Sequence, residues 1–544
     1  MTGADLLVEE LSARGVSYVA TLNGHGLDPF LIACRRAQMR VIDVRNEQAA
    51  GYMAEVTGRL SRSVGVCAVS GGVAHANALT GVVNAWFDGA PMLLITGITP
   101  LADLDRGQFQ DFNPVPMADP VCKYARLVDV PQNVPQITHE AFVAATTGRP
   151  GPVHLALPMD VASAQVDPAS VSRSPVRSGR VSGGISAPDT VLIQEAAQLL
   201  GDAKRPLLVA GSGCYYAQGE EPLAEFVRQQ HVPTVVPIWD RGAIRQPLKA
   251  FMGVIGAASG GPKLLEDADL ILLIGADLDY RVGHASPPAV SEQARIVRID
   301  ADAARLRSDR QFDLCIEGSP RLAFESLSNA CRDLACKPAT AWLKEAVRRR
   351  DEHRRRCEAL ADALPAGMNG RDVVRAIEKV LDDDTILLVD GGNIGQWFHQ
   401  LLAVKYPGHW LTCGASGVVG WGMPGAMAAR ALHPDKPIVL LSGDGSFTFT
   451  LSELECAARQ GLPFVAVVAD DRQWGISVTG HVAAFGEPLY SLLGETRLDL
   501  VAKGLGCDGV RVDAPDQLAG ALKEALASPR PTVIHVPIVP GSPK

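Results

Sequence analysis

The 544-residue sequence is poor in several features that mark whole classes of protein. Aromatic residues make up only 5% of it, and its net charge of −9 does not come from a block of like charges. No stretch of about 18 apolar residues is present that could form a transmembrane helix, and no basic segment followed by an apolar one opens the chain as in a signal peptide. We therefore expect neither membranes nor nucleic acids as main partners.

The eleven cysteines include no CxxC pair, so they do not form the usual spacing of a zinc site. The closest pair, Cys331 and Cys336, is also wrongly spaced for one. Cys67 lies in the apolar segment VGVCAVS, where a buried thiol acts as a small hydrophobic group. Dispersed cysteines of this kind favour a reducing compartment, and we expect a cytoplasmic protein.

The chain is rich in glycine (53 residues), and 47% of its residues are apolar. An apolar fraction of this size excludes a disordered chain. Apolar segments such as VGVCAVS and PMLLITG alternate with helical patterns, which is typical of parallel sheets covered on both faces. The predicted fold class is α/β, with three doubly wound parallel-sheet domains. Their expected bounds are 1–165 for the first, 189–330 for the central and 369–544 for the third domain, with a linker at 166–188 and a connector at 331–368.

The strongest motif lies in the third domain, where two apolar segments end in acidic residues. PIVLLSG ends at Gly443 and is followed by Asp444 and Gly445, and FVAVVAD ends at Asp470 and Asp471. The carboxyl ends of neighbouring parallel strands are where open α/β sheets bind ligands. Glycine lets the backbone approach a phosphate closely, and two carboxylates can hold Mg²⁺ together with diphosphate oxygens. A tight turn with helix-capping acids is the structural alternative.

With a spacer of 24 residues between Gly445 and Asp470, this segment resembles the thiamine-diphosphate (ThDP) motif, in which GDG is followed at similar spacing by an Asn pair. Here acidic residues replace that pair. The resemblance implies that Asp444 and Asp471 bind Mg²⁺ through their side chains and Gln473 through its backbone carbonyl. It also places Gly443, Gly445 and Ser446 beside the diphosphate, and it leaves the role of Asp470 open.

Two further segments carry the same resemblance. RNEQAAG contains Glu47 and opens a helix after a strand, as does the family segment whose Glu contacts the aminopyrimidine of the cofactor. The alternative for Glu47 alone is an acid favoured at a helix N-terminus. GASGVVGWGMP resembles the loop under the thiazolium ring. It implies that the Gly417 carbonyl accepts a hydrogen bond from the pyrimidine amine and that Val419 supports the bent cofactor.

The substrate side is assigned by the resemblance alone. It implies that His25, in LNGHGLDP, and Gln110, in RGQFQDF, line the substrate pocket as catalytic candidates, although His25 has the alternative of a structural loop residue. Asn393, Trp474 and Gly475 are implied to contact the cofactor, with packing as the alternative for Trp474.

The similarity extends over essentially the whole chain and is nearest to the acetolactate synthase-like group, which includes benzaldehyde lyase and 2-hydroxyacyl-CoA lyases. It implies a ThDP- and Mg²⁺-dependent carbon–carbon lyase or carboligase acting on small 2-oxo acids or 2-hydroxy ketones. Glu47 would then exchange a proton with the cofactor's pyrimidine ring. The alternatives are a 2-hydroxyacyl-CoA lyase and a non-catalytic ThDP-binding regulatory protein.

The central domain and the assembly complete these expectations. Asp277 occupies a place where the family commonly has an arginine facing a phosphate, and because a carboxylate repels phosphate, FAD is unlikely. The GxGxxG at 420–425 follows no strand directly, so it is not interpreted as a dinucleotide fingerprint. In the family the pyrimidine and diphosphate sites lie on different domains and meet between chains. The resemblance therefore implies a homodimer or homotetramer.

Overall fold

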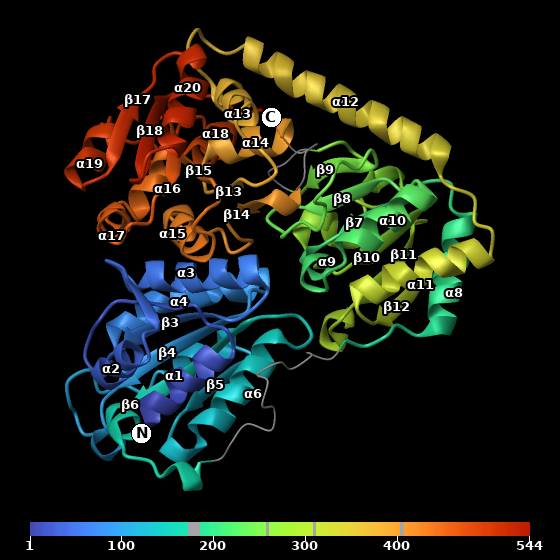
Figure 1. Cartoon of the computed structure of the whole chain (residues 1–544). Helices are drawn as coiled ribbons and strands as arrows, with labels where there is room; N and C mark the ends of the chain where they lie inside the picture. The colour runs from blue at the N-terminus through green and yellow to red at the C-terminus, as the bar shows by residue number, and fades with distance from the viewer. Residues whose placement is uncertain (172–184, 257–260, 308–311, 403–406, 544) are drawn as a thin grey trace.

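The computed structural model describes residues 1–171, 185–256, 261–307, 312–402 and 407–543. These residues form three six-stranded parallel sheets, each with helices packed around it (Figure 1). The α/β class with three doubly wound domains is confirmed. The middle of the expected linker, 172–184, lies outside the described residues. Within them, no helix is both long and apolar enough to span a membrane. All eleven cysteines are free.

The first sheet has the strand order β2-β1-β3-β4-β6-β5. Its central strands β3 and β4 are buried along their whole length, as expected for strands covered on both faces. The strands are β1 Tyr18–Thr21, β2 Arg40–Asp43, β3 Gly65–Ser70, β4 Met92–Ile98, β5 Tyr124–Leu127 and β6 Pro152–Pro158. The α-helices are α1 Gly3–Ala13, α2 Asp28–Arg36, α3 Glu47–Ser61, α4 Val73–Asp88, α5 Val115–Ala118, α6 Val134–Thr146 and α7 Met159–Ser163.

The third sheet, β14-β13-β15-β16-β18-β17, repeats the strand order of the first when both are counted from their first strand. This equal topology supports a common origin of the two domains. The strands are β13 Ile386–Val389, β14 Trp410–Thr412, β15 Ile438–Gly443, β16 Val465–Asp470, β17 Asp508–Arg511 and β18 Thr532–Pro537. The α-helices are α13 Gly370–Glu378, α14 Asn393–Leu401, α15 Gly422–Leu432, α16 Asp444–Phe449, α17 Glu453–Arg459, α18 Gly475–Phe485, α19 Leu498–Gly504 and α20 Pro515–Leu526.

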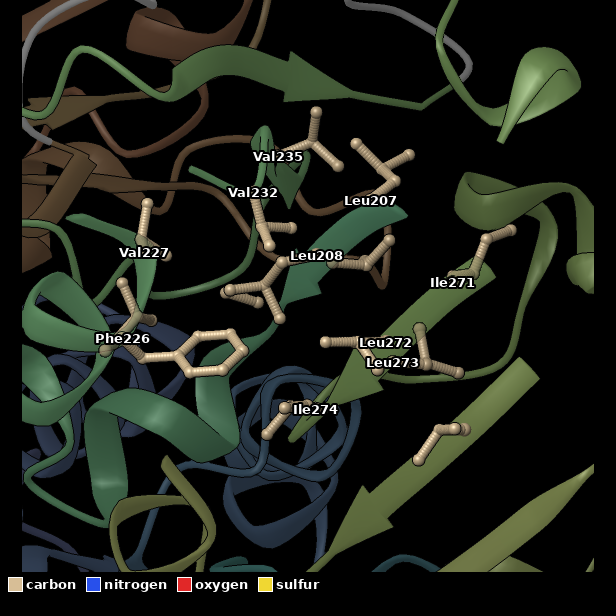
Figure 2. Close-up of a cluster of buried hydrophobic side chains, with 14 of the residues drawn as sticks. Leu207, Leu208, Phe226, Val227, Val232, Val235, Ile271, Leu272, Leu273 and Ile274 are labelled. Carbon is tan, nitrogen blue, oxygen red and sulfur yellow. The ribbon is translucent and has the colours of Figure 1, made fainter. Parts of the chain in front are cut away.

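The central sheet has a different order, β12-β11-β10-β7-β8-β9. Figure 2 shows part of its core, where Leu208 and Leu272 of neighbouring strands pack near Phe226. The long helix α12 then leads to the third domain (Figure 1). The strands are β7 Pro206–Ala210, β8 Thr234–Pro237, β9 Phe251–Ile255, β10 Leu270–Ile274, β11 Arg295–Asp300 and β12 Leu314–Glu317. The α-helices are α8 Thr190–Asp202, α9 Ser212–Tyr216, α10 Glu220–Gln230, α11 Pro320–Asp333 and α12 Thr340–Asp362.

The first and third domains pack against each other through α3 and α15 (Figure 1). Residues 49–59 of α3 are all buried, because the helix lies between its own sheet, α4 and α15. A helix buried on every side is normally apolar. Glu55 and Arg59 are therefore unusual in it.

The GDG segment is itself helical, because α16 begins at Asp444 and α17 follows it. The aromatic and β-branched residues of GDGSFTFT have low helix propensity, and tertiary packing overrides it here. Asp444 thus opens a helix, where a negative side chain is favoured.

Candidate active site

Three carboxylates meet at the carboxyl ends of β15 and β16, which are parallel neighbours in the third sheet. Asp444 is buried at the start of α16, and Asp470 and Asp471 follow on the next strand end. Burial, and then the charges of Asp470 and Asp471, raise the pKa of Asp444 to about 8. Burial also raises the pKa of Asp471 to about 6. Side chains at such a site resist ionising together unless a cation lies near them.

Asp470, whose role the sequence left open, is held by a buried histidine. His535 of β18 lies with Nε2 2.8 Å from Asp470 Oδ2, and the Arg472 amide donates to Asp470 Oδ1 at 3.1 Å. Although burial acts to raise the pKa of Asp470, the hydrogen bond with His535 and its charge keep it below its usual value. The other ring nitrogen of His535 is 3.5 Å from Asp499 Oδ1. Asp470 is thus oriented by the next strand of the sheet.

Glycines at this edge are required by close packing. A Cβ on Gly475 would lie 2.9 Å from Asp471 Oδ2 and 2.9 Å from Asn393 Cβ. A Cβ on Gly445 would lie 2.9 Å from the Trp474 ring. Trp474 therefore packs on the GDG turn, and Asn393 approaches Asp471. The Asn393 side-chain amide donates to the Gly541 carbonyl, while its buried Oδ1 has no hydrogen-bond partner.

The loop between β14 and α15 packs against the same edge of the third sheet. The Gly420 amide donates to Ser446 Oγ at 3.0 Å. A Cβ on Gly391, at the end of β13, would lie 3.0 Å from Ser446 Oγ and 3.3 Å from Val419 Cγ1. Gly417 has a φ of +77° and open space where a side chain would be. The residues expected to contact diphosphate and thiazolium thus lie together.

A cavity of about 220 Å³ opens between these loops. It is bounded by the end of β13, the first turns of α14, the β14–α15 loop, the start of α18 and one residue of the central domain. Its lining comprises Trp239, Val389, Asp390, Gly391, Gly392, Gly395, Gln396, His399, Cys413, Gly414, Gly417, Val418, Val419, Trp474, Gly475, Ile476 and Ser477.

The first domain fixes the β14–α15 loop from the other side. The Ala415 amide donates to Asp88 Oδ1 at 3.0 Å, and Ser416 Oγ donates to Asn84 Oδ1 at 2.6 Å. Both acceptors belong to α4. The loop that carries Gly417 therefore depends on the position of α4.

Behind this loop lies a buried group of charges that includes Arg59, which is 1% exposed. Arg59 Nη1 lies 3.3 Å from Glu55 Oε1 and 3.3 Å from Asp88 Oδ2, and it donates to the Thr412 carbonyl at 2.9 Å. Glu55 accepts a hydrogen bond of 2.7 Å from Trp421 Nε1. Burial raises the pKa of Glu55 to about 7. The group joins both domains beside the cavity.

Glu47 is the first residue of α3 and is half-buried in the single chain. Its Oε2 accepts from Asn77 Nδ2 at 3.0 Å. The loop before it is held by the third domain, because the Arg45 amide donates to both carboxyl oxygens of Glu453 at 3.0 and 3.1 Å. Glu453 is fully buried, and burial raises its pKa to about 7. Glu47 is thus only partly shielded from solvent in the single chain.

His25 and Gln110 lie near each other at the carboxyl edge of the first sheet. The His25 ring stands edge-on to Phe109 at 5.5 Å, and a Cβ on Gly72 would lie 3.5 Å from Gln110 Cγ. Gln110 has a φ of +55°, and its buried Oε1 has no hydrogen-bond partner. No hydrogen bond among the described residues connects His25 or Gln110 to the cavity of the third domain.

The central domain has a separate cleft of about 120 Å³ at the carboxyl ends of its strands. Asp277 projects into it and pairs with Arg305, with Arg281 at 3.4 Å and with Arg149 at 3.7 Å. These arginines are thus already neutralised by acids of the same chain.

Sequence reasoning missed four buried polar groups around the site, namely the Glu55–Arg59 pair, Glu453, His535 and His399. For the pair a signal was present, since Glu55 and Arg59 are spaced by four residues on an otherwise apolar helix. For the other three, no local pattern distinguishes them from surface residues.

Family models described as thiamine pyrophosphate enzyme domains match most of the chain. The N-terminal TPP binding domain matches residues 1–117, the central domain 193–327 and the C-terminal TPP binding domain 390–536. One relative is a probable acetolactate synthase large subunit of Methanococcus aeolicus, 26% identical over 100% of this chain and 93% of its own. Others are 2-hydroxyacyl-CoA lyase 2 of Caenorhabditis elegans (28%; 96% and 87%) and acetolactate synthase isozyme 2 large subunit of Escherichia coli (27%; 99% and 96%). The chain therefore belongs to the thiamine pyrophosphate enzymes, within their acetolactate synthase-like group.

Proposed function

We propose that the protein is a ThDP- and Mg²⁺-dependent carbon–carbon lyase or carboligase that acts on small 2-oxo acids or 2-hydroxy ketones in the cytoplasm. The observation that carries the proposal is the meeting of Asp444 and Asp471, at neighbouring strand ends, with the loop that packs on Ser446 through Gly420. Gly417 and Val419 of this loop line the adjacent cavity. The names of the relatives support the same reaction class.

The residues present fit the cofactor and its ion. Asp444, Asp471 and the Gln473 carbonyl would hold Mg²⁺, whose octahedral shell needs further oxygens from diphosphate and water. Gly443, Gly445, Ser446, Asn393, Trp474 and Gly475 would surround the diphosphate and thiazolium, with Val419 supporting their bend.

When bound, ThDP supplies a carbon nucleophile and then accepts the electron pair of the carbon–carbon bond that breaks. Glu47 would move a proton to and from a pyrimidine ring nitrogen, and the Gly417 carbonyl would orient the exocyclic amine. His25 and Gln110 would face the substrate. The loop contacts to Asp88 and Asn84 keep Gly417 in place for this task.

Glu47 is only half-buried and bonds to Asn77 of its own domain, and no hydrogen bond among the described residues joins it to the cavity of the third domain. We propose a homodimer or homotetramer in which the first domain of one copy closes the cavity of the other. Dilution should therefore reduce specific activity in parallel with dissociation, measured by mass photometry and by assay at matched concentrations. Full activity of isolated monomers would refute the shared site.

The hydrogen bond from His535 positions Asp470 and, through the backbone, Asp471. His535→Leu should weaken metal binding about 10–100-fold, as does loss of the groups that orient metal ligands. The measurement is the affinity for Mn²⁺ in the presence of ThDP, followed by electron paramagnetic resonance. His433→Leu is the matched control, because His433 lies at the end of α15 rather than beside the carboxylates. Equal affinity of His535→Leu and wild type would contradict this positioning role.

The direct test incubates the protein, ThDP and Mg²⁺ with 2-oxo acids, 2-hydroxy ketones and 2-hydroxyacyl-CoAs while following CO₂ and aldehyde release. Turnover of a 2-oxo acid or a 2-hydroxy ketone supports the proposal. Turnover of acyl-CoAs alone would instead favour a 2-hydroxyacyl-CoA lyase, the activity in the name of the Caenorhabditis elegans relative. A protein that binds ThDP but turns over no donor would be a regulatory ThDP-binding protein.

We also propose that the enzyme works without FAD, because Asp277 and its arginine partners occupy the cleft of the central domain. The purified protein should then show no flavin absorbance. Added FAD should not change its activity.

A further inference from the structure

The cavity extends along one face of α14. Gly392, Gly395, Gln396 and His399 all line it, and they recur at the three- and four-residue spacing of one helix face. At 1.5 Å per residue, His399 lies about 10 Å farther along the helix than Gly392. This inner end of the cavity is therefore beyond the turn that would bind the diphosphate.

The buried ring of His399 has a nitrogen without a hydrogen-bond partner. It is 5% exposed, its Nδ1 is buried without a hydrogen bond, and no hydrogen bond of the ring to a described residue is present. Buried polar groups left unpaired are costly, and each one in a native structure calls for an explanation such as a ligand. Burial lowers the pKa of His399 to about 4, so near neutral pH the ring has one donor and one acceptor nitrogen.

Asp390 is the one acidic residue among the described residues that line this cavity. Asp390, which is 2% exposed, belongs to the lining and accepts from the amides of Gly391 at 2.7 Å and Gly422 at 2.9 Å. Among the described residues that line the cavity there is no Lys or Arg. A ligand carboxylate placed next to Asp390 would meet a like charge, and no protein cation of the lining would offset it.

We propose that His399 and Gln396 form a subsite for an uncharged hydroxyl group, so that the acceptor substrate is a hydroxylated aldehyde or ketone rather than a 2-oxo acid. This assignment rests on the proposed function, because it takes the cavity as the ThDP pocket. A hydroxyl donates and accepts at once and matches a neutral imidazole, whereas a carboxylate only accepts. In carboligation the donor 2-oxo acid loses its carboxylate as CO₂, and the electron pair of that broken bond forms the new bond from the donor's carbonyl carbon to the acceptor's carbonyl carbon. The acceptor's carbonyl oxygen gains a proton. The hydroxyl on His399 is unchanged.

Three aldehydes of equal length test the subsite, since acetaldehyde, glycolaldehyde and glyoxylate carry a methyl, a hydroxymethyl and a carboxylate group. The holoenzyme is given one 2-oxo acid that it decarboxylates, and kcat/KM is measured for each acceptor. Wild type should prefer glycolaldehyde to acetaldehyde, and acetaldehyde to glyoxylate, by about tenfold per step, the effect of one buried hydrogen-bonded group. His399→Phe should abolish the preference for glycolaldehyde.

Two controls separate a substrate contact from other roles. His433→Phe, at the end of α15 and outside the cavity lining, should keep the wild-type ratio. The dissociation constant of ThDP, measured by tryptophan fluorescence, should be equal in wild type and His399→Phe. A tenfold loss of ThDP affinity would assign His399 to the cofactor and overturn the subsite.

Failure of the subsite and failure of the proposed function give different results. The subsite is overturned if wild type prefers glyoxylate, or if His399→Phe keeps the wild-type ratio of kcat/KM for glycolaldehyde to that for acetaldehyde. In either case, decarboxylation of the donor still supports the proposed function. Absence of turnover with every 2-oxo acid and every 2-hydroxy ketone refutes the proposed function. The ring ¹⁵N resonances of His399 in the wild-type holoenzyme then test the subsite without turnover. They should shift with ethylene glycol and not with acetate, and no shift with ethylene glycol overturns the proposal.

Discussion

Glu47→Gln should reduce kcat by about 10²–10⁴-fold, the usual contribution of a positioned proton-transfer group, and leave ThDP binding nearly unchanged. Glutamine has the same shape as glutamate and can still hydrogen bond to a pyrimidine nitrogen, but it cannot exchange a proton with it. The structure indicates that the variant keeps the local backbone in place and so can still bind ThDP. Asn46 caps α3 by accepting from the Gln48 amide at 2.9 Å, and Glu453 holds the preceding loop, so neither anchor involves the Glu47 side chain.

The measurement for this prediction is kcat with saturating ThDP, combined with the dissociation constant of ThDP. Glu455→Gln is the matched control, because Glu455 contacts the same loop through an exposed ion pair with Arg45 at 2.7 Å. Exposed pairs contribute about 1 kcal/mol or less, so this variant should retain most activity. An undiminished rate of Glu47→Gln would exclude Glu47 as the proton-transferring group.

The fold could be predicted where strands are long, central and apolar. β3, β4, β15 and β16 are fully buried along their length, so their composition alone identified them. The unpredicted strands are mainly short or partly polar. β5 is only half-buried and β17 contains Asp508 and Arg511, so neither shows the continuous apolar pattern of a strand covered on both faces.

For the candidate site, the sequence predicted that Asp444 and Asp471 lie at neighbouring strand ends, and the structure places them there. Contacts between distant segments were not visible. The partnership of Asp470 and His535 spans two strands of the sheet, and Glu453 meets the loop before Glu47 across a domain boundary. Such pairs depend on tertiary packing, which periodicity does not encode.

Arg59→Met should lower the free energy of unfolding by about 3–5 kcal/mol, the cost of removing one partner from a buried charge group. Glu55 and Asp88 would both lose their contact with the guanidinium, and the Thr412 carbonyl would lose a donor. The effect should depend on pH. Burial already raises the pKa of Glu55 to about 7, and a carboxyl group whose pKa is raised on folding contributes stability at low pH that is lost as pH rises through the folded pKa. Without Arg59 that pKa rises further, so the deficit should be larger at about pH 8 than at about pH 5.

Urea denaturation of wild type and variants at both pH values measures this difference. Arg459→Met is the matched control, because Arg459 also joins the first and third domains, but its pair with Asp43 at 2.6 Å is 44% exposed on both sides. It should cost about 1 kcal/mol or less. Adding Glu55→Gln to Arg59→Met should recover part of the loss at high pH, since it removes one unpaired charge. Because Arg59 also supports the loop of Gly417, the single variant should bind ThDP more weakly than the control. Equal stability of Arg59→Met and Arg459→Met would show that the buried charge group does not hold the two domains together.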